Sequence, residues 1–185
     1  MNKTLWKTIR VDRCFDNKWI KVDKETVLLP DKKKIDFYII KGQPVVAVLG
    51  ITKGNKVLLV DQYRQAIKKN MIDLPGGRVE KEETLKEAAK REFFEETGWE
   101  ISKLRKLTSF YFDPGRSDKQ ATIFIGTAKP GDRKRDVDST ENTSVYQKNF
   151  HDLWQEVTED KIKGTTLRLA IFSLYFSKHK SAYIR

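Results

Sequence analysis

The sequence is poor in the residues that form covalent cross-links and nitrogen-rich metal sites. Cys14 is the only cysteine among 185 residues, which excludes an intramolecular disulfide and a zinc site made of several cysteines. The only histidines are His151 and His179, too few for the imidazole-rich sites that zinc favours. Any metal bound by this chain is therefore expected to have oxygen ligands.

Long hydrophobic runs are also missing. Val45 to Ile51 and Val57 to Val60 are strand-sized, well short of the roughly 20 apolar residues that span a bilayer. The first ten residues lack the apolar core of a secretion signal, so we expect a cytoplasmic protein that makes no membrane contact. With 34% charged and 38% hydrophobic residues, the chain is long enough for one well-buried domain with a small appendage.

Acidic residues are outnumbered, because 37 Lys and Arg accompany 26 Asp and Glu and give a formal net charge of +11. The basic residues are spread along the chain without interleaved aromatic residues, so nucleic acid is not the expected partner. Between Gly77 and Glu100 the balance reverses, with eight Glu against five basic residues. An anionic segment in a cationic chain suits a polyanionic substrate that meets a divalent metal ion.

The first 40 residues alternate polar and apolar side chains, and a turn signal follows at Pro30-Asp31. Alternation of this kind predicts two or three antiparallel strands. We therefore assign residues 1–43 to a small N-terminal antiparallel β subdomain and residues 44–185 to the main domain.

The main domain mixes strand and helix signals. Strand-like runs at 43–52 and 56–63 flank Lys53-Gly54-Asn55, which is a hairpin signal. Later elements are predicted from the same patterns: strands at 102–112 and 120–128, a long polar loop at 129–148, and an apolar helix at 165–177. Strands combined with two well-separated helices predict an α/β fold with helices on both faces of one sheet.

The first of these helices is expected between Thr84 and Gly98. Thr84 can cap its start, Glu87 three residues later completes a capping-box pattern, and Gly98 can end it. The preceding Leu74-Pro75-Gly76-Gly77 is predicted to be a loop whose glycines permit a tight bend. Glu82 and Glu87 are expected on the solvated surface.

Other glutamates of this helix fall where apolar residues should be. On a helical wheel of about 100° per residue, the apolar stripe is centred on Leu85, and Glu92 and Glu96 lie in its middle with Glu95 on its edge. Unpaired buried carboxylates are destabilising, so something must neutralise them. A bound cation is the simplest answer.

The spacing of this segment is specific: Gly77, five residues, Glu83, seven residues, Arg91-Glu92-Phe93, one residue, Glu95-Glu96, one residue, Gly98-Trp99. This pattern resembles the Nudix box throughout, with Phe93 and Trp99 where the family usually has aliphatic residues. The resemblance implies an α/β/α sandwich around a mixed sheet. It also implies hydrolysis of a nucleoside diphosphate linked to another moiety, with Mg²⁺ or alternatively Mn²⁺. Such metals relieve the charge that repels an attacking water.

The resemblance also implies roles for individual residues. Glu92 and Glu96 are the implied metal ligands, and they fit physically because hard cations need oxygen ligands. By analogy the carbonyl of Gly76 joins them, and Glu95 contacts the metal directly or through water. Arg91 is expected to orient a carboxylate, since Glu95 is within reach four residues away.

Two segments outside the box resemble the ADP-ribose pyrophosphatase branch of the family, namely Tyr111 to Asp118 and Gln62-Tyr63-Arg64. They imply the following substrate-binding residues: Arg64, Pro114, Gly115, Ser117 and Asp118. Lys119 stands where the branch usually has Glu, and the loop before the box is Leu-Pro-Gly instead of Leu-Pro-Ala. The resemblance implies ADP-ribose as the substrate, and these two departures leave a nucleotide-sugar, another ADP-linked compound or a dinucleotide open.

The resemblance leaves the general base and the assembly less closely defined. Glutamates on a late loop often serve as the base in this branch, and Glu141 is our candidate, while Glu83 is expected to support the helix start. Relatives exchange their entry strands between two subunits, so a homodimer is expected.

Rival functions are a GDP-sugar or dinucleotide pyrophosphatase, a non-catalytic nucleotide sensor using the same pocket, and RNA decapping. The intact carboxylate set disfavours the sensor.

Overall fold

The structure is a computed structural model that describes residues 6–132 and 143–177. The described residues form two compact units. One lies within Met1–Pro44 and Phe110–Gln120, and the other within Val45–Ser109 and Ala121–Arg185.

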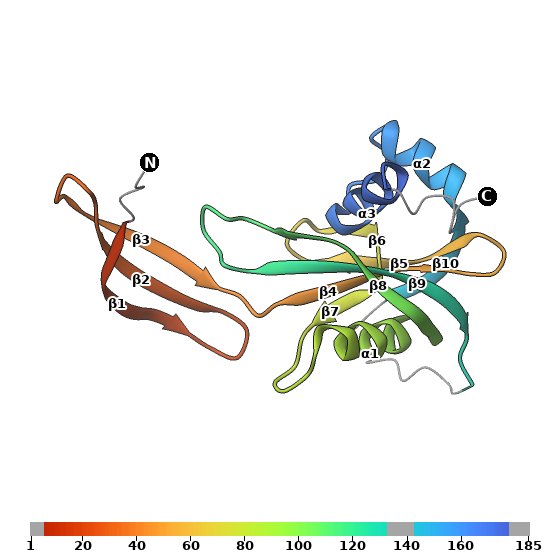
Figure 1. The fold of residues 1–185 in the computed structure, drawn as a ribbon, viewed down its shortest axis with the longest axis horizontal. Coiled ribbons are helices and arrows are strands. Elements are labelled where there is room, and N and C mark those ends of the chain that lie inside the picture. Colours follow the sequence, from red (N-terminus) through yellow and green to blue (C-terminus); the bar gives the residue numbers. More distant parts are fainter. Residues whose placement is uncertain (1–5, 133–142, 178–185) are drawn as a thin grey trace. The chain divides into compact units, whose positions relative to one another are not determined.

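The first unit contains a three-stranded antiparallel sheet in the order β1-β2-β3 (Figure 1). Its strands are β1 (Lys7–Asp16), β2 (Lys21–Leu28) and β3 (Lys34–Lys41). The predicted N-terminal antiparallel strands are thus confirmed. The same unit holds residues 110–120, whose backbone is tied to β3 because the Ile40 N–H donates to the Arg116 carbonyl at 2.7 Å.

The second unit is built on a seven-stranded sheet. Its strands are β4 (Val45–Ile51), β5 (Lys56–Arg64), β6 (Lys69–Asp73), β7 (Gly76–Arg78), β8 (Trp99–Tyr111), β9 (Gln120–Pro130) and β10 (Thr143–Asn149). The main path is β10-β5-β4-β9-β8, while β6 pairs with β5 and β7 with β4. Strand β4 is parallel to β9 and antiparallel to β5 and β7, so the sheet is mixed.

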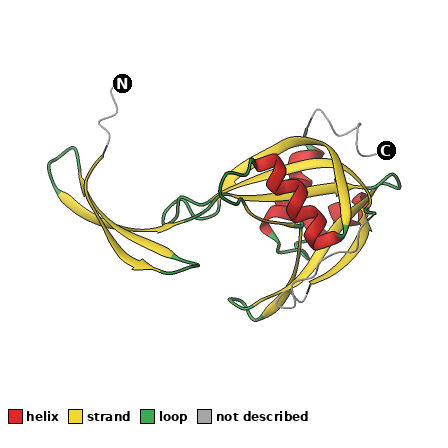
Figure 2. Cartoon of the chain, turned by 90° about the horizontal axis from the view of Figure 1, so that it is seen from below, coloured by secondary structure: helices red, strands yellow, loops and turns green. Residues whose placement is uncertain are grey.

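Three helices among the described residues cover this sheet. Helix α1 (Leu85–Thr97) lies on one face, and α2 (Phe150–Thr158) and α3 (Thr165–Tyr175) lie on the other (Figures 1 and 2). This arrangement confirms the α/β/α sandwich. None of the helices among the described residues is long and apolar enough to cross a membrane.

Helix α1 begins and ends at the predicted residues. Thr84 and Glu87 form both hydrogen bonds of a capping box, and Gly98 takes the left-handed conformation with φ of 73° as the C-cap. Ala88, Ala89 and Phe93 of the predicted stripe are buried, whereas Leu85, the predicted centre of that stripe, is 39% exposed. Leu85 opens the first turn, so the packed face is set by residues one to two turns further along.

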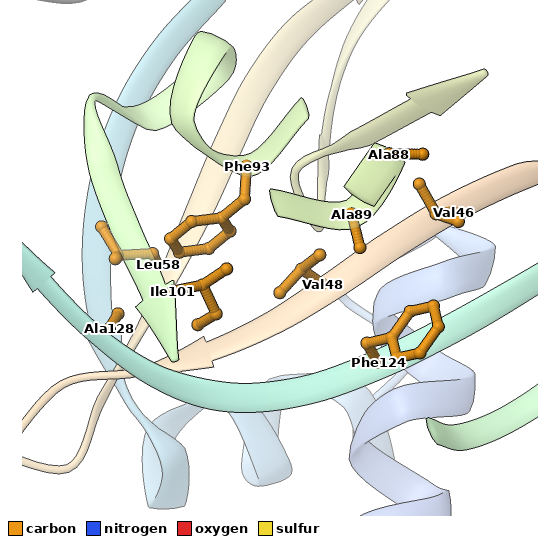
Figure 3. Close-up of a cluster of buried hydrophobic side chains, with 9 residues drawn as sticks. All are labelled: Val46, Val48, Leu58, Ala88, Ala89, Phe93, Ile101, Phe124 and Ala128. Carbon is orange, nitrogen blue, oxygen red and sulfur yellow. The ribbon is translucent and has the colours of Figure 1, made fainter. Parts of the chain in front are cut away.

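The core between α1 and the sheet is shown in Figure 3, and it contains Val46, Val48, Leu58, Ala88, Ala89, Phe93, Ile101, Phe124 and Ala128. The Phe93 ring lies directly over Gly50 of β4. A Cβ atom added at Gly50 would lie 2.4 Å from the ring, which is well inside van der Waals contact. Glycine at this position therefore lets the helix approach the centre of the sheet.

The prediction of one long loop over 129–148 is wrong at its C-terminal end. Residues from Thr143 form β10, which pairs antiparallel with β5, and Val145 packs against the core. The short apolar pair Val145-Tyr146 lies between polar residues, which hid the strand pattern. Helix α2 was not predicted either, although Phe150, Leu153 and Val157 recur at helical spacing and are buried.

Candidate active site

The guanidinium of Arg91 binds three glutamates, of which one lies just before α1 and two lie within it. Its Nη1 donates to Glu92 Oε1 and to Glu95 Oε2, each at 2.9 Å. Its Nε and Nη2 donate to the two carboxylate oxygens of Glu83, both at 2.9 Å, in a bidentate pair. Nη2 also donates to the Arg78 carbonyl at 3.0 Å, so the guanidinium joins α1 to β7.

These contacts perturb the proton affinities of both partners. The hydrogen bond from Arg91 lowers the pKa of Glu83 below its ordinary value, and the effect exceeds the opposing effect of burial. The pKa of Arg91 rises, mainly through Glu83 and then through Glu92 and Glu95. Both shifts favour the charged forms of Glu83 and Arg91.

Glu96 lies one turn beyond Glu92 and is held by the backbone of the loop before the box. Its side chain is buried, with 9% exposure, and Oε2 accepts a hydrogen bond from the Gly76 N–H at 2.7 Å. At Gly77 an added Cβ would lie 2.4 Å from Glu92 Oε2, and at Gly76 it would lie 2.1 Å from the Val46 carbonyl oxygen. Gly77 thus lets β7 pass close to the Glu92 carboxylate, and Gly76 lets it pass close to the backbone of β4.

The burial of the carboxylates agrees with their positions on the helical wheel. The side chains of Glu92 and Glu95 are 15% and 48% exposed, and Glu96 is the most buried. Within the protein, Arg91 places a positive charge beside Glu92 and Glu95, and the Gly76 N–H donates a hydrogen bond to Glu96. A cation bound at these carboxylates stays a prediction.

The donor set nevertheless fits a hard divalent cation. Glu92 Oε1 and Glu95 Oε2 converge on one nitrogen, Arg91 Nη1, so both carboxylates already reach a common cationic position. Within residues 6–132 and 143–177, no group of three or more His, Cys, Asp or Glu side chains is arranged so that these side chains alone could hold a metal ion. Carboxylate and carbonyl oxygens are the ligands that Mg²⁺ and Mn²⁺ prefer.

The sequence-predicted residues of the segment 110–120 make contacts within the first unit. Ser117 Oγ donates to the Ile40 carbonyl at 2.8 Å, and Asp118 Oδ1 accepts from the Gly42 N–H at 2.7 Å. Asp118 also pairs with Lys41. Burial acts to raise the pKa of Asp118, but the hydrogen bonds from Lys41 and Gly42 outweigh it and leave that pKa below its ordinary value.

The rest of this segment forms a turn. The Asp113 carbonyl accepts from the Arg116 N–H at 3.0 Å and from the Ser117 N–H at 2.8 Å, which places Pro114 and Gly115 inside the turn. Lys119 Nζ lies 5.1 Å from the centroid of the Phe112 ring, a cation–π distance.

Arg64 ends β5 in the second unit, where it pairs with Lys69 of β6. The structure thus brings Glu83, Arg91, Glu92 and Glu95 together, and it places the Glu96 carboxylate within hydrogen-bond distance of the Gly76 N–H. Glu141, the predicted base, lies outside the described residues. Sequence reasoning missed the bidentate Glu83–Arg91 pair, whose eight-residue separation spans the helix start, and it gave no role to Asp73.

Comparisons with known proteins agree with this geometry. A family model described as NUDIX domain matches residues 41–168. An ADP-ribose pyrophosphatase from Bacillus subtilis (strain 168) is 32% identical over 166 residues, covering 89% of this chain and 90% of that protein. A methanol dehydrogenase activator from Bacillus methanolicus is 29% identical over 94% of this chain and 96% of its own length. A crystal structure of an ADP compounds hydrolase superposes with a TM-score of 0.81 at 15% identity, covering 96% and 95% of the two chains.

Proposed function

This chain belongs to the Nudix family, and we propose that it hydrolyses the pyrophosphate bond of a nucleoside diphosphate linked to another moiety. ADP-ribose, split into AMP and ribose 5-phosphate, is the proposed substrate. The observation that carries the proposal is the complete carboxylate set of the box, gathered by Arg91 and by the Gly76 N–H. Similarity to an ADP-ribose pyrophosphatase over nine-tenths of both chains supports the choice of substrate.

We propose that Glu92, Glu96 and the Gly76 carbonyl hold a divalent metal, Mg²⁺ or Mn²⁺, with Glu95 beside it. When bound, the metal neutralises charge on the pyrophosphate and lowers the pKa of a nearby water. Arg91 orients Glu92 and Glu95 through its Nη1, so both carboxylates are placed before the metal arrives. Oriented ligands reduce the reorganisation needed during catalysis.

Further roles are proposed for a general base and for a residue that binds phosphate. Glu141 or Glu95 takes the proton of the attacking water, and Arg64 at the end of β5 binds a phosphate oxygen through its guanidinium fork. Replacement of Glu141 by Gln tests the first role. Loss of most turnover with unchanged Mg²⁺ affinity is expected, and near-normal turnover would eliminate Glu141 as the base.

For the segment 110–120 we propose a positioning role in substrate recognition. Ser117 and Asp118 hold its backbone to β3, and the turn around Pro114 and Gly115 presents the loop. Lys119 stands at the end of this loop, where its charge can select the moiety attached to the diphosphate. GDP-sugars and dinucleotides are the rival substrates, and a nucleotide sensor is the rival without catalysis.

We further propose a homodimer that uses the three-stranded sheet. Among the described residues of the first unit, Val27 is the one apolar side chain that is buried, while Trp6, Val11, Phe15 and Tyr38 are more than half exposed. A large exposed apolar surface is typical of an interface. Sedimentation equilibrium should give twice the chain mass; a monomer at micromolar concentration would reject the dimer. A cytoplasmic location stays a prediction.

The function is tested by a substrate panel with Mg²⁺, comparing kcat/KM for ADP-ribose, GDP-mannose, NADH, diadenosine polyphosphates and capped RNA. ADP-ribose should have the highest kcat/KM. Glu96→Gln should lower kcat on the order of 10²-fold or more, because a metal ligand is lost. Glu82→Gln is the matched control, since this exposed glutamate precedes the same helix and should leave kcat unchanged. Tight ADP-ribose binding without any turnover would favour the sensor instead.

A further inference from the structure

Helix α3 begins without a local cap. Its N-cap residue is Gly164, which has no side chain to accept from the free N–H groups of the first turn. The carboxylate of Asp73, at the end of β6, accepts hydrogen bonds from this first turn instead. Asp73 Oδ1 accepts from the Leu167 N–H at 2.7 Å and from the Thr166 hydroxyl. The cap of α3 is thus supplied by a residue from another part of the sheet.

Asp73 binds the start of its own loop as well. The Leu74 N–H donates to the same oxygen, Oδ1, at 2.9 Å. Gly164 makes the close approach possible, because a Cβ there would lie 2.8 Å from Asp73 Cγ and 2.4 Å from the Ile72 carbonyl oxygen. Burial raises the pKa of Asp73, although the hydrogen bonds from Thr166, Leu74 and Leu167 oppose the rise. The carboxylate therefore joins helix, strand and loop at one buried oxygen.

The loop that starts at Asp73 leads directly to the carboxylates of the box. Leu74 is buried, and the Pro75 carbonyl accepts from the Val48 N–H at 2.9 Å. The next residue, Gly76, donates its N–H to Glu96 at 2.7 Å. Only three peptide bonds separate Asp73 from Gly76. The position of the Gly76 backbone is therefore fixed by Val48 on one side and by Asp73 at the loop start.

We propose that Asp73 is a positioning residue for the metal-binding loop, and that it places Gly76 against Glu96 by clamping the loop to the first turn of α3. This inference rests on the proposed function, since Gly76 and Glu96 are proposed ligands. A purely structural role, in which Asp73 only stabilises α3, is the alternative. The positioning role predicts that loss of the Asp73 carboxylate changes the loop and weakens metal binding. The purely structural role predicts a loss of stability alone.

The test compares three variants of the full chain without substrate. Asp73→Ala removes the clamp, and Asp73→Asn keeps an oxygen that can accept from the Leu167 N–H. Ala170→Gly weakens the same helix at a buried position that Asp73 does not contact. Thermal unfolding sets a temperature at which all variants are folded. Mn²⁺ affinity is then measured by electron paramagnetic resonance, and hydrogen exchange is followed in peptides covering 72–80.

Asp73→Ala should weaken Mn²⁺ binding about 10- to 100-fold, the range for residues that orient metal ligands. Exchange in 72–80 should speed up. Asp73→Asn should restore most of the affinity, and Ala170→Gly should keep it. With substrate, Asp73→Ala should lower kcat and leave KM unchanged. Thr166→Val, which removes one donor to Asp73, should give a smaller loss of Mn²⁺ affinity if Asp73→Ala does not fold.

The proposal is overturned if folded Asp73→Ala binds Mn²⁺ as the wild type does, or if Ala170→Gly loses the same affinity. Unchanged affinity in Thr166→Val, when Asp73→Ala cannot be obtained folded, also overturns it. Failure of the proposed function is separate from these results. A wild-type chain that turns over no substrate, yet loses Mn²⁺ affinity on Asp73→Ala, would reject the reaction and keep the clamp.

Discussion

The seven-stranded sheet and the three-stranded sheet of this chain are held together by different interactions. Leu49, Leu58 and Phe93 are among many apolar side chains with no exposure in the larger unit. Among the described residues of the smaller unit, Val27 alone plays that part, and ion pairs such as Lys24–Asp36 link its strands instead. Exposed ion pairs contribute little to stability because solvent screens them, so the two units are not expected to be equally stable on their own.

The difference in packing between the two units corresponds to different structural roles. The larger unit is a rigid base that holds buried carboxylates close to a backbone N–H, which requires a dense core around α1. A three-stranded sheet with one buried apolar side chain covers too little surface to fold by itself. The exposed apolar side chains of the smaller unit are the reason for proposing a homodimer.

The largest expected effect concerns the core of the larger unit. Phe93→Ala should lower the free energy of unfolding by about 3–5 kcal/mol, because the ring fills the space over Gly50. Phe37→Ala is the matched change in the smaller unit, where the ring is only partly buried and stacks on Trp6. Urea unfolding of both variants measures the difference. Equal losses would show that the two sheets are packed alike.

Dilution should affect the units unequally. A tenfold dilution costs a dimer about 1.4 kcal/mol of association free energy. Hydrogen exchange in peptides from β1 to β3 should therefore accelerate as the protein is diluted, while peptides from β4 and β5 should keep their protection. Uniform acceleration, or none, would argue against a dimer built on the smaller sheet.

The smallest expected effect is a pH dependence of the β2–β3 pair. The hydrogen bond from Lys24 lowers the pKa of Asp36 below its ordinary value of 3.8, with a further contribution from Thr26. A lowered pKa in the folded state contributes stability above pH 3.8 that is lost as the pH falls through the folded pKa. Amide exchange in β2 and β3 should therefore rise below pH 4, roughly, and Asp36→Asn should reduce that rise. Identical acid profiles for Asp36→Asn and the wild type would show that the pair contributes nothing.

The sequence predicted α1 well because its signals are local. Thr84, Glu87 and Gly98 specify both ends of the helix, and the apolar period specifies its face. The error at Leu85 arose because the wheel treats every turn alike, whereas the first turn extends beyond the packed face. The contact of Arg91 with Glu92 was also unexpected, since adjacent residues point apart on a helix and only a long side chain bridges them.

Other parts of the molecule carry no local signal. Asp73 caps α3 from a strand far away in sequence, and nothing around Gly164 indicates the source of the cap. Strand β10 is recognisable only once β5 provides its partner, because its partly buried residues Val145, Tyr146 and Lys148 show no regular alternation of apolar and polar side chains. These elements depend on tertiary contacts, which cannot be inferred from local patterns in a single sequence.

The parallel pairing of β4 with β9 sets a limit on how early the protein can fold during synthesis. Val45 pairs with Ala121, and α1 and β8 lie between the two strands in sequence. A nascent chain that has emerged only as far as β8 would carry Val46, Val48 and Phe93 without the neighbouring strand β9, which supplies Phe124 and Ala128 to the same core. Such a chain exposes apolar surface to chaperones and to other nascent chains until translation passes β9.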